Sequence, residues 1–437
     1  MSWTIFYMFS GFSGTLPWNN CTEGINSAAC GHSVSPPEDY FNHVMLGLDD
    51  TISWTNFGTF KWKLALCLLA AWTIVCLVFV QGIKSSGKVV YFTAVFPYVM
   101  LVIFFVNGLT LEGASDGIAY YMSPNFERLL DLGVWRAAAN QIFFSLGPSL
   151  GCLISMASHN RFNNNCHKDA VLVSLINCGT SVFAGFVVFS YLGYMAHLQG
   201  KPVEEVVTSG PALAFIAYPQ AMSTLPLPQL WSFLFFFMLL TLGLDSMFAY
   251  VETIITVLLD HFKWLRSKKH WLAVGVCTTG FVLGLSMVTS GGVYMLTLID
   301  KNCASWNILI CAIIESLLVA WVYGTDRFMD NVNEMGMKLS APLQTYYRLC
   351  WKFATPGLLF SILVMQFVDM SPVKYGHYVF PPAVQAMGWV IACTSASLIP
   401  GVAAWQIYRR YIKSNSDSDD QDNSIPQLII YTSNEKS

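Results

Sequence analysis

Residues 141–151 read Gln-Ile-Phe-Phe-Ser-Leu-Gly-Pro-Ser-Leu-Gly and lie within an apolar segment that spans about residues 135–157. The segment is long enough to cross a bilayer, yet Gly147, Pro148 and Gly151 stand at its centre. Proline removes a backbone donor and clashes with the preceding turn, and glycine adds an entropic cost, so we expect two half-helices. Unpaired backbone at that depth survives only where it lines a cavity, and such broken helices supply ion and substrate sites in secondary transporters. The alternative is a proline-kinked packing helix.

Composition sets the class of protein. The chain has 437 residues, of which 54% are hydrophobic and only 11% charged, against roughly one-quarter charged in soluble proteins. We therefore expect a polytopic all-α protein in a lipid bilayer. No basic patch or nucleic-acid motif is present, so nucleic acid is not an expected partner. No Walker-type loop is present either, and we expect a carrier without ATP hydrolysis rather than an enzyme.

Hydropathy divides the chain into spans. Besides the broken helix, eight continuous apolar spans are predicted, at about 64–83, 89–107, 170–198, 230–259, 271–289, 294–323, 349–368 and 383–407. Met1 to Leu16 is apolar but short, and reads as the tail of a helix. We expect residues 1–412 to form one transmembrane domain, and the Ser- and Asp-rich residues 413–437 to be a disordered tail.

The charged loops predict an orientation. Lys and Arg gather in alternate loops, which the positive-inside rule places in the cytoplasm. Cys21 and Cys30 then lie outside, beside Asn20, which begins an Asn-Cys-Thr glycosylation pattern. A disulfide between the two cysteines requires the same location. Nine passes from outside end inside, so we expect a multi-pass plasma-membrane protein with a cytoplasmic C-terminus.

An acid lies within the predicted span 230–259. Asp245 follows Thr-Leu-Gly-Leu and precedes Ser246. An intramembrane carboxylate is expensive and its natural partner is a cation. Hard cations such as sodium bind several oxygens, which Asp245, Ser246 and backbone carbonyls near Leu242 can supply. The alternative is a carboxylate paired for packing, and for Glu252 and Glu315 we expect pairing with hydroxyls.

Two neutral polar pairs share a spacing. Asn177 and Ser181 are four residues apart, as are Gln141 and Ser145, so each pair presents an amide and a hydroxyl on one helix face. Together they could offer N–H and O–H groups to an anion and a carbonyl oxygen to a cation. Interhelical hydrogen bonding is the alternative for each pair.

Several motifs resemble one family as a set. They are Gln-Ile-Phe-Phe-Ser at 141–145, Asn-Arg-Phe-Asn-Asn-Asn-Cys at 160–166, Gly-Phe-Val-Val-Phe-Ser at 185–190, Gly-Pro-Ala-Leu-Ala-Phe-Ile-Ala-Tyr-Pro at 210–219 and Leu-Gly-Leu-Asp-Ser at 242–246. Leu-Pro-Trp at 16–18, with the cysteine pair, and Gly-Lys-Val-Val-Tyr-Phe-Thr-Ala at 87–94 resemble two of its loops. Over residues 1 to about 412 the chain resembles the neurotransmitter:sodium symporters.

The resemblance implies a LeuT-type fold of twelve helices with inverted repeats, and uptake driven by Na⁺ and dependent on Cl⁻. It implies roles for individual residues, as follows: a first sodium site at Ser145 and Asn177; a second at Leu242 (backbone), Asp245 and Ser246; a chloride site at Gln141, Ser145, Asn177 and Ser181; substrate contacts at Phe144, Gly147 and Leu150; an outer gate at Asp300; and an inner gate at Asp260. Chloride-independent bacterial relatives carry a carboxylate where Ser181 stands, which leaves a charge for chloride to supply.

Two features bear on the substrate and on activity. Residues 113–121 and 231–246 look most like the glycine and proline transporters, so a small amino acid, glycine first, is expected; proline, GABA or another neurotransmitter are alternatives.

By the resemblance, the chain starts within the family's third helix and lacks helices 1, 2 and part of 3. A second hypothesis is therefore a truncated, non-transporting membrane subunit that associates with full-length relatives as a homo- or hetero-oligomer. His159 stands where the family usually has Tyr.

Overall fold

The computed structural model describes residues 1–21, 30, 35–49, 51–80, 83–206, 211, 213–303, 306–368, 372–376 and 378–418. The first half is built of these helices: α1 (Ser2–Ser10), α2 (Pro36–Asp39), α3 (Trp62–Val80), α4 (Ile83–Leu109), α5 (Ala114–Met122), α6 (Leu132–Leu146), α7 (Cys152–Ser158), α8 (Cys166–Gln199) and α9 (Val203–Val206). The second half continues with α10 (Tyr218–Ser223), α11 (Pro228–His261), α12 (Lys269–Leu285), α13 (Gly292–Cys303), α14 (Trp306–Leu317), α15 (Thr325–Glu334), α16 (Ala341–Leu349), α17 (Thr355–Val368) and α18 (Pro382–Ser418).

Short elements connect these helices. They are π-helical turns at Tyr40–Leu46, Leu213–Ala217, Leu318–Gly324 and Cys350–Ala354, and 3-10 turns at Phe126–Leu130, Lys263–Lys268 and Ser286–Val288. Strands β1 (Lys374–Tyr375) and β2 (Tyr378–Val379) pair antiparallel, with Tyr375 opposite Tyr378. The long apolar runs of the described chain are helical because a helix satisfies its backbone groups internally, as lipid requires.

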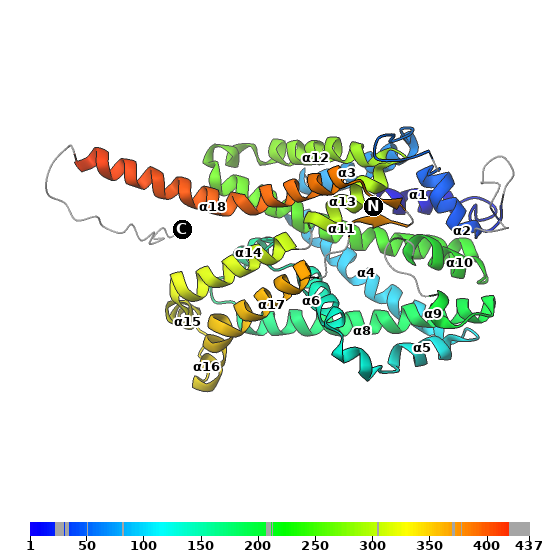
Figure 1. The fold of residues 1–437 in the computed structure, drawn as a ribbon, viewed down its shortest axis with the longest axis horizontal. Helices are drawn as coiled ribbons and strands as arrows, with labels where there is room; N and C mark the ends of the chain where they lie inside the picture. Colours follow the sequence, from blue (N-terminus) through cyan, green and yellow to red (C-terminus); the bar gives the residue numbers. More distant parts are fainter. Residues whose placement is uncertain are drawn as a thin grey trace.

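The long helices run roughly along one direction (Figure 1), as expected of a bundle that crosses a membrane. In the described residues, eight helices are long and apolar enough to do so, and they coincide with the eight continuous spans predicted from the sequence. Most boundaries differ by a few residues, but three helical segments extend 8 to 11 residues beyond the predicted spans, to Lys263, Glu334 and Ala341. Helix α18 runs on to Ser418, past Lys413. Residues 419–437 of the expected tail lie outside the described residues.

Helices α8 and α11 are long, with 34 residues each. At 1.5 Å per residue each is about 51 Å long, which exceeds the roughly 30 Å of a hydrocarbon core. The side chain of Asn165 accepts a hydrogen bond from the Lys168 amide at the start of α8, and Gly200 in the left-handed region ends it. Both helices therefore reach from one end of the bundle to the other.

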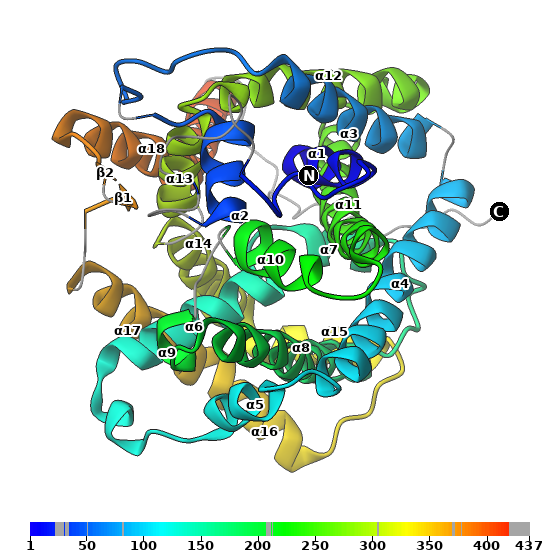
Figure 2. The ribbon, with the colours of Figure 1, turned by 90° about the vertical axis from the view of Figure 1, so that its right-hand side faces the viewer.

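The ends of the bundle carry the short elements. In Figure 1, α2, α9 and α10 lie at the right-hand end, and α15 and α16 at the left. Figure 2 looks along the bundle from the right-hand end, with α10 near the middle, α3 beside α12, and α5 on the outer side of α8. Two segments between the predicted spans also contain helices: α5 lies in residues 109–133, and α9 and α10 lie in residues 199–228.

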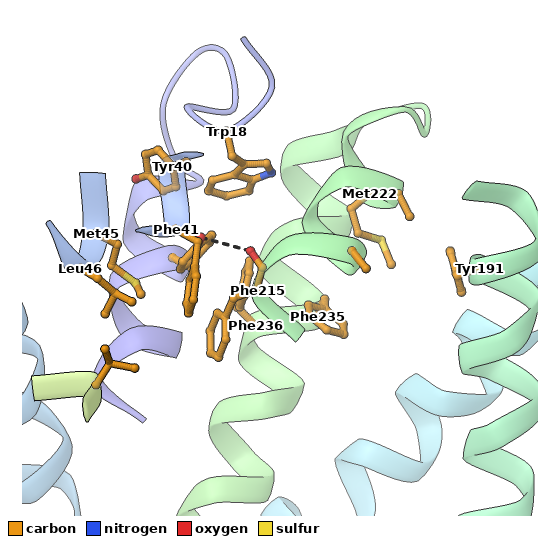
Figure 3. Packing of buried hydrophobic residues seen from close by; sticks show 14 of the residues in the cluster. Trp18, Tyr40, Phe41, Met45, Leu46, Tyr191, Phe215, Met222, Phe235 and Phe236 are labelled. Carbon is orange, nitrogen blue, oxygen red and sulfur yellow. Dashed lines mark hydrogen bonds between the residues drawn. The ribbon is translucent and has the colours of Figure 1, made fainter. Parts of the chain in front are cut away.

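A buried aromatic cluster closes the right-hand end (Figure 3). Tyr7, Trp18, Phe41 and Phe236 are each at most 2% exposed. The Tyr7 hydroxyl donates to the Phe215 carbonyl at 3.2 Å, and the Tyr7 and Trp18 ring centroids are 5.1 Å apart. The cluster joins four segments that are distant in sequence, so it holds the loop after α1 against α11. Beyond Trp18, Cys21 and Cys30 form a disulfide, as predicted.

Candidate functional site

The predicted break in the helix at residues 147–151 is confirmed. Helix α6 ends at Leu146 and α7 begins at Cys152. Three residues between them have left-handed φ angles, namely Gly147 at +59°, Ser149 at +66° and Gly151 at +76°. Glycine adopts this region freely, whereas a serine there costs about 1–2 kcal/mol. Strain held inside an apolar span is typical of sites where the backbone serves a ligand.

The two half-helices pack against different neighbours. On α6, Ala139 and Phe143 pack against an apolar cluster from α14 and α17, and Asn140 Nδ2 donates to Gln366 Oε1 on α17 at 2.8 Å. The other half, α7, packs on α11. A Cβ placed on Gly151 would lie 3.4 Å from Thr253 Cγ2 of that helix. The break thus lies between two separately packed helices.

Two of the predicted ion-binding residues meet across α6 and α8. The Ser145 hydroxyl donates to Asn177 Oδ1 at 2.8 Å. The other amide atom, Asn177 Nδ2, is buried and has no hydrogen-bond partner in the described structure. An unmade bond at a buried N–H donor costs about 1–3 kcal/mol, so this group favours an acceptor such as an anion. The hydroxyl of Ser149, within the break, is likewise buried and unpaired among the described residues.

Gln141 and Ser181 flank this pair. Gln141 lies one turn before Ser145 on α6 and is exposed, and the Ser181 hydroxyl donates to the Asn177 carbonyl within α8 at 3.0 Å. Of the four residues expected to bind chloride, Ser145 and Asn177 therefore meet, and Gln141 and Ser181 lie one turn away from them on the same two helices. Their groups are amides and hydroxyls without net charge, which suits an anion bound by N–H and O–H donors.

Asp245 is half-buried on α11, and its partner is a residue that the sequence reasoning missed. The Thr93 hydroxyl on α4 donates to Asp245 Oδ1 at 2.5 Å. One turn before Asp245, the Leu242 carbonyl accepts a long bond of 3.4 Å from the Ser246 hydroxyl. Thr253, where the break approaches α11, is eight residues or about 12 Å further along the helix. Asp245 thus lies beside α4 and roughly two turns from the break.

Of the three residues expected to contact substrate, Phe144 lines an open cavity. Phe144 is 57% exposed, and together with Gln141 and Asp300 it lines a cavity of about 280 Å³ between α6, α13 and α14. Gly147 and Leu150 are packed close within the break, since a Cβ on Gly147 would lie 3.4 Å from Leu150 Cδ1. A space of this size suits a small solute.

The expected gate acids, Asp300 and Asp260, lie near the C-terminal ends of α13 and α11. Asp300 on α13 is exposed and also lines a second cavity of about 720 Å³, together with Lys374 and Tyr375. Burial, with Tyr294 nearby, raises the pKa of Tyr375 to about 12, so its phenol stays neutral at physiological pH. Asp260 is the penultimate residue of α11, and its Oδ1 lies 3.6 Å from Arg266 Nη2, in a pair too exposed to stabilise the fold much.

Glu252 differs from the expectation of hydroxyl partners. Its carboxylate lies 3.8 Å from His159 Nε2 and 3.9 Å from Lys269 Nζ. The family resemblance had marked His159 as an unusual residue, but the sequence alone did not place it beside an acid. Their approach depends on how α7, α11 and α12 pack.

Comparison with known proteins identifies the family. Residues 1–410 match the Sodium:neurotransmitter symporter family. The chain belongs to this family. It is 42% identical over 428 residues to "Sodium- and chloride-dependent GABA transporter 2" of Homo sapiens, covering 94% of this chain and 70% of that protein. The protein of the same name from Bos taurus is 41% identical over 428 residues, with the same coverage of both chains.

Membership of the symporter family confirms the resemblance and the all-α, multi-pass fold class. It also makes the chain one of a family of transporters rather than of enzymes. The relatives just named are GABA transporters, so the glycine preference drawn from residues 113–121 and 231–246 finds no support in them.

Proposed function

We propose that this symporter carries a small amino-acid neurotransmitter across the plasma membrane together with Na⁺ and Cl⁻, and that GABA is its substrate. The observation that carries the proposal is the break at residues 147–151 beside the Ser145–Asn177 pair. This arrangement joins freed backbone, a cavity and an unpaired buried amide in one place, as ion-coupled carriers require. GABA is favoured over glycine because the reported relatives are named for it.

The ions are assigned by the chemistry of the donors. Groups that suit Cl⁻ are the N–H and O–H groups of Asn177 Nδ2, Ser181 and Gln141. A first Na⁺ suits the side-chain oxygens Ser145 Oγ and Asn177 Oδ1. The Asp245 carboxylate, the Ser246 hydroxyl and the Leu242 carbonyl suit a second Na⁺, which prefers oxygen ligands. Phe144, Gly147 and Leu150 then face the solute, and Asp300 and Asp260 belong to the outer and inner gates.

Coupling follows as a thermodynamic linkage. If Na⁺ completes the pocket that receives the substrate carboxylate, each ligand binds more tightly in the presence of the other. We assign this transport to residues 1–412, with Asn20 on the outer side and the C-terminus in the cytoplasm. The alternation of Lys- and Arg-rich loops supports that orientation.

The proposal is tested by uptake of labelled GABA, glycine and proline into cells that express the chain, with surface protein measured in parallel. We expect GABA uptake that disappears when choline replaces Na⁺ and falls when gluconate replaces Cl⁻. Asp245→Asn should weaken the Na⁺ dependence, whereas the matched variant Asp116→Asn, at an exposed acid of α5, should not. Uptake that persists without Na⁺ would refute the proposal. Surface protein without any uptake would instead support a non-transporting membrane subunit.

A further inference from the structure

The hydroxyl of Thr93, a threonine inside α4, has a carboxylate of another helix as one of its hydrogen-bond partners. Its Oγ1 lies 3.1 Å from the Val89 carbonyl and 3.2 Å from the Val90 carbonyl, the bonds such a hydroxyl ordinarily makes. It also lies 2.5 Å from Asp245 Oδ1, across an interface between two helices. A hydroxyl carries one proton, so it can satisfy only one of these acceptors at a time. The carboxylate, being charged, is the strongest acceptor of the three.

Apolar packing on both sides holds this pair in register. Toward one end of the interface, the Phe96 and Phe237 rings meet edge to face with centroids 5.1 Å apart. Toward the other, Val90 packs against the buried apolar cluster that contains Phe248. Thr93 itself is 3% exposed. The contact between hydroxyl and carboxylate is therefore set by the packing of α4 on α11, and does not depend on a mobile surface side chain.

We propose that Thr93 is a positioning residue for the second sodium site. By holding Oδ1 of Asp245, it sets the plane of the carboxylate and leaves Oδ2 to meet a cation together with Ser246 and the Leu242 carbonyl. Groups that orient a metal ligand in this way typically change metal affinity by about 10- to 100-fold when removed. The inference rests on the proposed function, because it takes Asp245 to be a sodium ligand.

The test compares Thr93→Val, which keeps the shape and removes the donor, with Thr93→Ser, which keeps the hydroxyl. Thr73→Val is the matched control, because Thr73 lies on α3 and its hydroxyl donates to the Leu69 carbonyl of its own helix, at 2.7 Å. The readout is the Na⁺ concentration for half-maximal uptake. The Na⁺ concentration for half-maximal protection of purified protein against thermal unfolding is measured beside it, since this does not require transport.

We expect Thr93→Val to raise both Na⁺ concentrations about 10-fold, and Thr93→Ser and Thr73→Val to resemble the wild type. The Cl⁻ dependence should not move, whereas a general loss of packing would shift both ions together. In the Asp245→Asn background, Thr93→Val should add no further shift, because the group that it positions is gone.

Three other results would contradict the role of Thr93 in positioning Asp245. Wild-type Na⁺ dependence in Thr93→Val would overturn it, and so would equal shifts for Na⁺ and Cl⁻. If both Thr93→Val and Thr93→Ala fail to fold while Thr93→Ser folds, the hydroxyl is required for packing and the inference is also wrong. A wild-type protein that neither transports with Na⁺ nor is protected by it would instead refute the proposed function.

Discussion

Helix α5 crosses α8 so closely that two glycines touch, and this contact allows a quantitative prediction. A Cβ on Gly193 would lie 2.5 Å from the Gly113 carbonyl oxygen and 2.6 Å from the Gly117 nitrogen. These neighbours are backbone atoms, which cannot rotate away as a side chain can. Because carbon contacts are optimal at about 3.5–4.0 Å, Gly193→Ala forces the two helices apart by about 1 Å.

The cost can be isolated by a second glycine on the same helix. Overpacking of this kind costs about 1–3 kcal/mol, and alanine returns about 1 kcal/mol of helix propensity. At Gly179, also on α8, a Cβ would meet nothing within 4 Å, so Gly179→Ala keeps the propensity gain alone. The difference between the two alanine variants should therefore equal the overpacking cost, about 1–3 kcal/mol.

Thermal unfolding of the detergent-purified variants, scanned at one rate, measures this difference. We expect Gly193→Ala to unfold at the lowest temperature and Gly179→Ala at or above the wild type. A third variant, Gly185→Ala, tests an intermediate case. Its added Cβ would lie 2.4 Å from the hydroxyl of Tyr121, and because this is the end of a side chain that can move, the unfolding temperature should fall between those of the other two variants. If Gly193→Ala is as stable as Gly179→Ala, the close crossing of α5 and α8 is wrong.

Two further predictions concern charge and topology. Replacing Ser181 with Glu puts a fixed negative charge beside Asn177, so uptake should continue without Cl⁻ while still requiring Na⁺. The uncharged variant Ser181→Gln should not gain this independence, and Cl⁻-dependent uptake by Ser181→Glu would contradict the chloride assignment. Asn20 is exposed beside the disulfide. Glycosidase treatment should therefore lower the apparent mass of the wild type but not of Asn20→Gln, and an unchanged wild-type band would remove the support for an outward loop.

Features that depend on local chemistry were predictable from the sequence. The break follows from Gly147, Pro148 and Gly151 themselves, because each residue acts on its own backbone. The eight continuous spans follow from hydropathy, since lipid tolerates only helices in such segments. The disulfide could be anticipated because the two cysteines share one short polar loop.

Contacts across helices could not be predicted in the same way. Thr93 and Asp245 are 152 residues apart, and Asn140 and Gln366 are 226 apart. Their meeting depends on how each helix is rotated about its axis. In a helix that is apolar on every side, as α4 is around Thr93, no stripe of hydrophobic residues marks the inner face. The polar partners of the site residues therefore appear only once the helices are packed together.

The separate packing of the two half-helices has a mechanical consequence. Helix α6 is attached to α14 and α17 through Phe143 and the Asn140–Gln366 bond, while α7 rests on α11. If α11 moves relative to α14 and α17, the five residues 147–151 must absorb the displacement, since both halves are held by their own neighbours. This short stretch, with its three left-handed residues, is thus the hinge between α6 and α7. A shift of α11 relative to α14 and α17 would therefore move the groups beside the hinge.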